Sequence, residues 1–158
     1  MRLFIRQRIF SWTDSFDVYD SDGTPRYTVR GEILSLTHKR HVRSSRTGEE
    51  VGVIRQRLLT LLPTFEILVN GQVLGTVRRQ LTLLRPSYQV DYLNWQVEGN
   101  FLGWEYRAVQ DRREILTISK DVFRLTDCYC LDFRDPSCEI PGLLLVLAID
   151  AANCSHNN

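Results

Sequence analysis

The sequence lacks the features that mark most secreted or membrane-spanning chains. It has only four cysteines in 158 residues, and three of them lie close together instead of forming a spaced disulfide framework. Charge interrupts the N-terminus too early for the apolar core of a signal peptide. The longest apolar run, Leu143 to Ile149, is far shorter than the roughly 20 residues that span a bilayer. We therefore expect a cytoplasmic protein with reduced thiols and no transmembrane segment.

Excess charge and catalytic motifs are also missing. Lys and Arg total 20 against 19 Asp and Glu, so a dedicated nucleic-acid binder is not expected. No nucleophile elbow, phosphate-binding loop, dinucleotide-binding loop or zinc-protease motif is present. All three histidines lie in a charged stretch or in the C-terminal tail. We predict no enzymatic activity, no catalytic residues and no cofactor.

The sequence does contain a repeated hairpin pattern. Four segments beginning at Ile5, Ile54, Val77 and Ile118 align, and each has an aromatic residue at offset 11 and an aliphatic residue at offset 13. This period of two predicts a half-buried returning strand in each copy. Apolar residues also recur at offsets 4 and 7, just before the expected connection. These are Ile9, Leu58, Leu81, Val122, Trp12, Leu61, Leu84 and Leu125.

Further alternating runs and turn signals fill the gaps between the four copies. The sharpest turn signal is Asn70-Gly71, because both central residues of a type I′ turn need positive φ. Altogether the pattern predicts about twelve short antiparallel strands, typical of a sandwich or barrel.

The C-terminal segment differs from the rest because it is apolar on every side. Asp135-Pro136 resembles a helix N-cap followed by the proline favoured at the first helical position. A short helix without a polar face must be buried in protein, and a twelve-stranded barrel has a lumen that a helix can fill. We predict a closed antiparallel barrel wrapped around this helix. The domain spans 1–153, with the helix at about 141–152 and a polar tail at 154–158.

Several segments resemble the LURP-one-related proteins. They are Leu3-Phe4-Ile5-Arg6-Gln7-Arg8-Ile9-Phe10-Ser11-Trp12, Val53-Ile54-Arg55-Gln56-Arg57-Leu58, Trp95-x-Val97-Glu98-Gly99, Ile118-Ser119-Lys120 and Leu147-Ala148-Ile149-Asp150. The resemblance covers almost the whole chain. It implies the tubby C-terminal-like fold, a twelve-stranded barrel around a hydrophobic helix, with Pro141-Gly142 as a departure near the helix start. It does not imply a function, since these are strand and core positions.

Basic residues form the first candidate site. They fall in a cluster that follows His38 and at equivalent strand positions of the repeats, and they can bind lipid headgroups or another polyanion. The alternative is a charged outer face that serves solubility alone. The candidate binding residues are Lys39, Arg40, Arg43, Arg46, Arg55, Arg57 and Arg78.

The cysteines form a weaker candidate site. Cys128 and Cys130 occupy offsets 10 and 12, which predicts that both point outward. With Cys138 and Cys154 their spacing matches no zinc-finger or zinc-ribbon pattern, so no metal site is predicted.

Three functions therefore remain open. The first is a non-enzymatic binding module whose partner is an anionic membrane surface, which would make it a peripheral membrane protein. The second is a structural or regulatory domain that binds another protein. The third is a metal-dependent or redox protein that uses the cysteine cluster.

Overall fold

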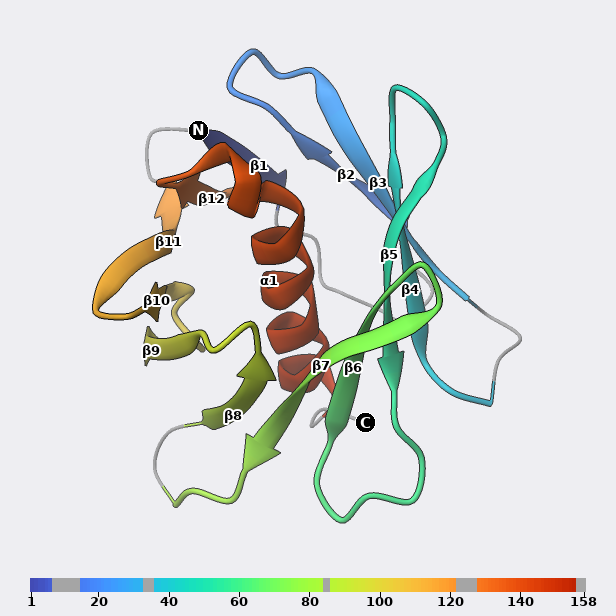
Figure 1. Ribbon diagram of the computed structural model, residues 1–158, viewed down its shortest axis with the longest axis vertical. Coiled ribbons are helices and arrows are strands. Elements are labelled where there is room, and N and C mark those ends of the chain that lie inside the picture. Colours follow the sequence, from blue (N-terminus) through green and yellow to red (C-terminus); the bar gives the residue numbers. More distant parts are fainter. Residues whose placement is uncertain (7–14, 33–35, 84–85, 122–127, 156–158) are drawn as a thin grey trace.

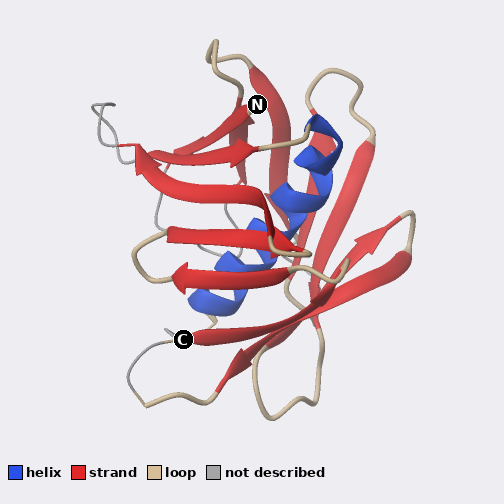
Figure 2. Ribbon diagram, turned by 60° about the vertical axis from the view of Figure 1, so that its left-hand side comes forward, coloured by secondary structure: helices blue, strands red, loops and turns tan. Residues whose placement is uncertain are grey.

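Twelve antiparallel strands curl around one long helix, α1 (Figures 1 and 2). The structure is a computed structural model and describes all residues except 7–14, 33–35, 84–85, 122–127 and 156–158. The strands are β1 (Arg2–Arg6), β2 (Ser15–Tyr19), β3 (Pro25–Gly31), β4 (Lys39–Ser44), β5 (Glu50–Gln56), β6 (Thr64–Val69), β7 (Gln72–Gln80), β8 (Ser87–Tyr92), β9 (Gln96–Asn100), β10 (Glu105–Gln110), β11 (Arg113–Asp121) and β12 (Cys128–Phe133). A short 3-10 helix, η1 (Pro136–Cys138), precedes α1 (Glu139–Cys154).

The repeated hairpins predicted from the sequence are confirmed by the strand register. In every copy the origin residue is paired with the aliphatic residue at offset 13 of the returning strand. The four pairs are Ile5 with Val18, Ile54 with Ile67, Val77 with Val90, and Ile118 with Leu131. Asn70 and Gly71 both have positive φ, at 51° and 75°, as the tight turn between β6 and β7 requires.

Aromatic side chains pack along the seam where the two end strands of the sheet meet. The sheet order places β8 and β9 at its two ends, and in the described part of the chain no strand pairing joins them. Tyr88 of β8 packs edge-on against Phe101, with ring centroids 4.9 Å apart, and Phe101 lies 5.1 Å from Tyr106 of β10. At this seam the two sides of the barrel are therefore held together by aromatic packing and not by a strand ladder.

The helix fills the barrel as predicted, but it begins earlier and ends later than the expected range of about 141–152. Asp135 caps η1 by accepting a hydrogen bond from the Ser137 backbone N–H, and α1 follows directly from Glu139. Pro141 lies in the first turn of α1, where the backbone N–H of a residue has no helical partner to lose. Gly142 packs so closely that an added Cβ would lie 2.6 Å from Cε1 of Phe133. Pro141-Gly142 therefore fits the barrel without breaking the helix.

Residues Leu143 to Ile149 are all buried in the core of the barrel. By length and composition alone, the 19-residue stretch Pro136–Cys154 is long and apolar enough to cross a membrane, but most of it is buried inside the barrel. Glu139 at its start bonds to Arg26, the second residue of β3, and Asp150 near its end bonds to Arg40, the second residue of β4. The helix therefore runs from one end of the barrel to the other.

Connections between neighbouring antiparallel strands alternate between the two ends of the barrel. Those that follow β3, β5, β7 and β9 lie where α1 ends, and we call this end the C-terminal rim. Those that follow β2, β4, β6, β8 and β10 lie where α1 begins, at the N-terminal rim. In Figure 1 the loops after β5 and β7 are at the bottom, toward the end of α1, and those after β2 and β4 are at the top.

Candidate functional site

A strip of basic side chains crosses the outer face of the barrel next to the C-terminal rim. Lys39 opens β4 and is paired in register with Arg55, near the end of β5. Arg57 follows β5, and its backbone N–H bonds to Thr64, whose register partner on β7 is Arg78. Since side chains alternate between the two faces of a strand, these positions lie outward, opposite the buried Ile54 and Val77. We call Lys39, Arg55, Arg57 and Arg78 the cationic strip.

One carboxylate holds two of these arginines. Glu66 of β6 accepts hydrogen bonds from Nη2 of Arg55 at 2.6 Å and from Nε of Arg57 at 2.9 Å. Burial opposes ionisation of Glu66, but hydrogen bonds from Arg55 and Arg57 outweigh it and hold the pKa of its carboxyl below the usual value. Two cations thus share one anion, which leaves positive charge on the outer face.

The other two members of the strip differ in their partners. Lys39 lies 3.3 Å from Oε2 of Glu32. Arg78 is exposed, and no ion pair joins it to any side chain in the described ranges. Exposed ion pairs such as Lys39–Glu32 contribute little to stability, so Lys39 can exchange its partner for an external anion at small cost.

Arg40 does not belong to a surface site, which corrects the sequence-based prediction. Its side chain is only 1% exposed, and Nη1 donates a 2.8 Å hydrogen bond to Oδ2 of Asp150 in α1. The reason is strand alternation, because Arg40 shares the inward face of β4 with Val42. Burial raises the pKa of Asp150, and Arg40 opposes that shift. The pair joins helix to barrel and is unavailable to a ligand.

Arg43 and Arg46 lie at the opposite end of the barrel from the cationic strip. Arg43 is near the end of β4 and within 3.9 Å of Glu50. Arg46 is in the turn that follows β4, where it lines a hollow together with Glu49. The predicted basic cluster therefore splits into three environments: the cationic strip, the barrel interior and the N-terminal rim.

The cysteines form no common site among the residues that the structure describes. All four cysteines lie in the described ranges, and none of them forms a disulfide. Cys130 is half-buried and Cys128 is only 2% exposed, although both alternate along β12 with the core residue Tyr129 and so lie on the outward face that the sequence predicts. β12 lies between β1 and β11 in the sheet, and Cys128 is covered despite its outward position. No group of three His, Cys, Asp or Glu in the described ranges is placed to hold a metal ion.

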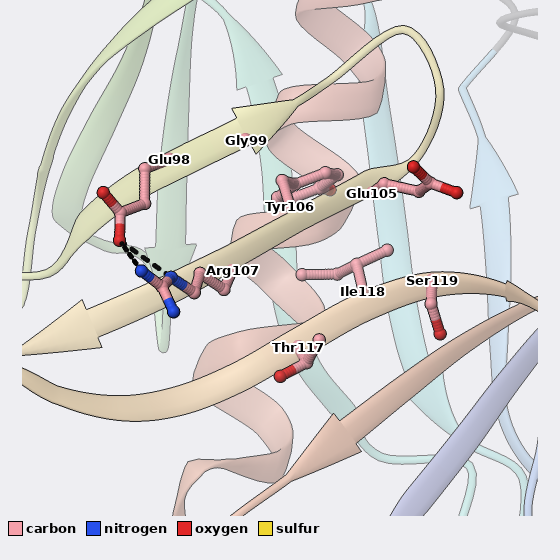
Figure 3. Close-up of a pocket in the computed structure, with 8 residues that line it drawn as sticks. All are labelled: Glu98, Gly99, Glu105, Tyr106, Arg107, Thr117, Ile118 and Ser119. Carbon is pink, nitrogen blue, oxygen red and sulfur yellow. Dashed lines mark hydrogen bonds and ion pairs between the residues drawn. The ribbon is translucent and has the colours of Figure 1, made fainter.

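A shallow hollow of about 520 Å³ lies on the outer face of β9, β10 and β11 (Figure 3). Its floor is formed where Gly99 and Ile118 flank Tyr106. Arg107 at its edge donates a 2.8 Å hydrogen bond to Glu98, as Figure 3 shows. Because its cation already has a carboxylate partner, this hollow is a weaker candidate than the cationic strip.

Sequence reasoning missed the two carboxylates that decide which basic residues are available. Glu66 occupies offset 12 of its repeat, a position read only as an outward polar residue. Asp150 is the carboxylate that follows the apolar run of α1, and a lone acid in a buried helix is a signal for a buried cationic partner.

Three comparisons with known proteins agree with this architecture. The LURP-one-related family model matches residues 1–150. The uncharacterized protein YxjI of Bacillus subtilis (strain 168) is 29% identical over 131 residues, which cover 83% of this chain and 80% of that protein. An X-ray structure of a protein from Arabidopsis thaliana superposes with a TM-score of 0.64 at 14% identity, over 95% of this chain and 90% of the plant chain. Neither the family description nor these names specify an enzyme activity.

Proposed function

The chain belongs to the LURP-one-related family, and we propose that it is a non-enzymatic module that binds anionic membrane surfaces through the cationic strip. The observation that carries this proposal is the charge imbalance around Glu66. Arg55 and Arg57 remain 38% and 46% exposed while sharing that single carboxylate. The exposed parts of both side chains can contact phosphate groups while the two arginines keep their bonds to Glu66.

The position of the strip favours a flat partner. It lies beside one end of the barrel, so an anionic surface approached end-on meets all its members at once. Each basic residue near an anionic membrane surface contributes about 1 kcal/mol to binding. The turns at the other end contain Arg46 and Arg112 but have more carboxylates than arginines. These carboxylates are Asp20, Asp22, Glu49 and Asp111. The resulting charge asymmetry would orient the barrel on the membrane as a peripheral protein.

Co-sedimentation with lipid vesicles tests the proposal. Purified protein is mixed with vesicles of phosphatidylcholine alone or with added phosphatidylserine, at low and at physiological salt. We expect binding to the anionic vesicles that weakens as salt rises, because ions screen exposed charge. The Arg57→Gln/Arg78→Gln variant is expected to bind about tenfold or more weakly.

The matched control is Arg43→Gln/Arg46→Gln, which removes two exposed arginines at the N-terminal rim. It is expected to bind vesicles as the wild type does. Equal loss in both variants would mean that net charge, not the strip, drives binding. If the wild type binds no vesicles at any salt concentration, the proposal is wrong and a protein partner becomes the leading alternative.

A further inference from the structure

Seven leucines project into solvent at the C-terminal rim. Their exposed fractions run from 52% at Leu58 to 105% at Leu59. Scattered single leucines on a surface need no explanation, but a gathering at one end of a barrel does. They are Leu36 after β3, Leu58, Leu59 and Leu61 after β5, Leu81 and Leu83 after β7, and Leu102 after β9.

The N-terminal rim has a different chemistry. In the described connections at that end, Leu93 is the only large apolar side chain that is exposed, at 43%. Val73 and Leu74 are half-exposed, but they belong to β7 itself. The connections after β5, β7 and β9, in contrast, contain no acidic residue. The barrel thus has one apolar end and one polar end.

Folding does not account for these leucines. Leu58, Leu61 and Leu81 occupy offsets 4 and 7 of the hairpin repeat, where apolar character suggests a core position, yet all three are exposed. Leu59 has a φ of 58°, in the left-handed region that costs a leucine about 1–2 kcal/mol. Leu59 is therefore both solvated and conformationally unfavourable in the isolated chain.

We propose that the C-terminal rim inserts its leucines into the interfacial layer of an anionic bilayer. This inference rests on the proposed function, because the cationic strip beside the rim supplies the attraction to lipid headgroups. The leucines add burial of apolar surface below the headgroups, so contact with lipid has an electrostatic and an apolar component. The C-terminal end of α1 faces the membrane, and the acidic turn after β2 faces away from it.

The chemistry of the rim fits a lipid surface better than a protein partner. The leucines lie on four separate connections, and every aromatic side chain in the described part of the chain is buried or half-buried. Protein interfaces depend on tryptophan, tyrosine and arginine in shaped pockets, and leucine is under-represented among their energetic centres. A fluid bilayer needs no complementary shape and accepts separate apolar tips.

The test compares two apolar variants in the vesicle assay described above. Leu61→Ser/Leu83→Ser removes two fully exposed leucines from the rim, and Val73→Ser/Leu74→Ser removes two half-exposed apolar residues of β7 as the matched control. Circular dichroism and thermal unfolding first establish that both variants fold. We expect the rim variant to bind anionic vesicles about tenfold or more weakly and the control variant to bind as the wild type does.

Salt separates the two components of binding. Screening weakens the contribution of the cationic strip but not apolar insertion. Binding that remains at high salt is therefore expected to be lost in Leu61→Ser/Leu83→Ser and retained in Arg57→Gln/Arg78→Gln. If the charge variant loses binding and the rim variant does not, membrane binding stands and insertion is wrong. If the reverse holds, insertion stands and the role of the strip is wrong.

Two results would overturn insertion entirely. One is a wild type that sediments with neither kind of vesicle, which also removes the proposed function. The other is a wild type that sediments as a dimer in analytical ultracentrifugation and becomes monomeric in Leu61→Ser/Leu83→Ser, with unchanged vesicle binding. The rim would then be an interface between two copies of the chain.

Discussion

At the scale of single residues, burial decides what each charge does. Arg40 and Arg55 are both basic, both lie on central strands and both have a carboxylate partner. Arg40 meets Asp150 inside the barrel, whereas Arg55 meets Glu66 on the outside. A buried pair cannot lose one partner cheaply, because the other charge is then left without compensation in a medium of low polarity.

The Arg40→Met variant tests this structural role. Asp150 is 3% exposed, so removal of its cation is expected to lower the free energy of unfolding by about 3–5 kcal/mol. Adding Asp150→Asn removes the uncompensated charge and should restore much of that loss. Urea unfolding measures both effects. A single variant within about 1 kcal/mol of the wild type would contradict the assignment of Arg40 to the core.

At the scale of elements, the position of α1 depends on close contacts at two glycines. Gly52 of β5 leaves room for Leu144, whose Cδ1 would lie 2.6 Å from an added Cβ. Gly142 performs the same role toward β12, where Phe133 is the neighbour. The helix therefore approaches the wall of the barrel more closely at these points than side chains would permit.

Gly142→Ala is expected to destabilise the protein even though alanine favours helix. In an ordinary helix this change stabilises by about 1 kcal/mol. Here the new methyl group meets Phe133 at 2.6 Å and Leu116 at 3.1 Å, and overpacking costs about 1–3 kcal/mol. Thermal unfolding measures the net loss. With Phe133→Leu added, the two changes should cost less together than the sum of each alone, and simple additivity would argue against the contact.

At the scale of the whole molecule, some charged residues are buried in ion pairs that connect α1 to the barrel, and others remain on the outer surface. Burial would raise the pKa of Glu66, but hydrogen bonds from Arg55 and Arg57 hold this pKa below its usual value. Arg134 likewise lowers the pKa of Glu114. A carboxylate with a lowered folded pKa adds stability above its unfolded pKa and loses that contribution as pH falls through the folded pKa. Asp150 acts in the opposite sense, because burial raises its pKa.

The lowered pKa of Glu66 predicts how the effect of Glu66→Gln on stability changes with pH. At neutral pH the variant is expected to be less stable than the wild type by about 1–3 kcal/mol, because two arginines lose a charged acceptor. As pH falls below the usual glutamate value of 4.5, the wild type loses the contribution of Glu66 and the difference should shrink. Urea unfolding at several pH values measures this difference in the free energy of unfolding. Glu98→Gln is the control at an exposed pair and should change stability by less than about 1 kcal/mol. A difference in stability that grows as pH falls would contradict the lowered pKa of Glu66.

The sequence by itself determined the class of the fold and much of its detail. Alternation of apolar residues predicted the strands, and the aligned offsets predicted four hairpins, each with a half-buried returning strand. The absence of a polar face on the segment from Leu143 to Ile149 predicted a central helix. These properties follow from local periodicity, which a chain expresses before any tertiary contact forms.

Only the tertiary structure decided which charged and apolar residues are available to a partner. Arg40 and Arg55 look alike in the sequence, and their opposite burial depends on strand phase and on Asp150, which is 110 residues away from Arg40. Leu58, Leu61 and Leu81, at offsets 4 and 7, look like core residues, and alternation of antiparallel connections places them in solvent at one end of the barrel. Availability depends on distant segments meeting in space, which a local pattern does not encode.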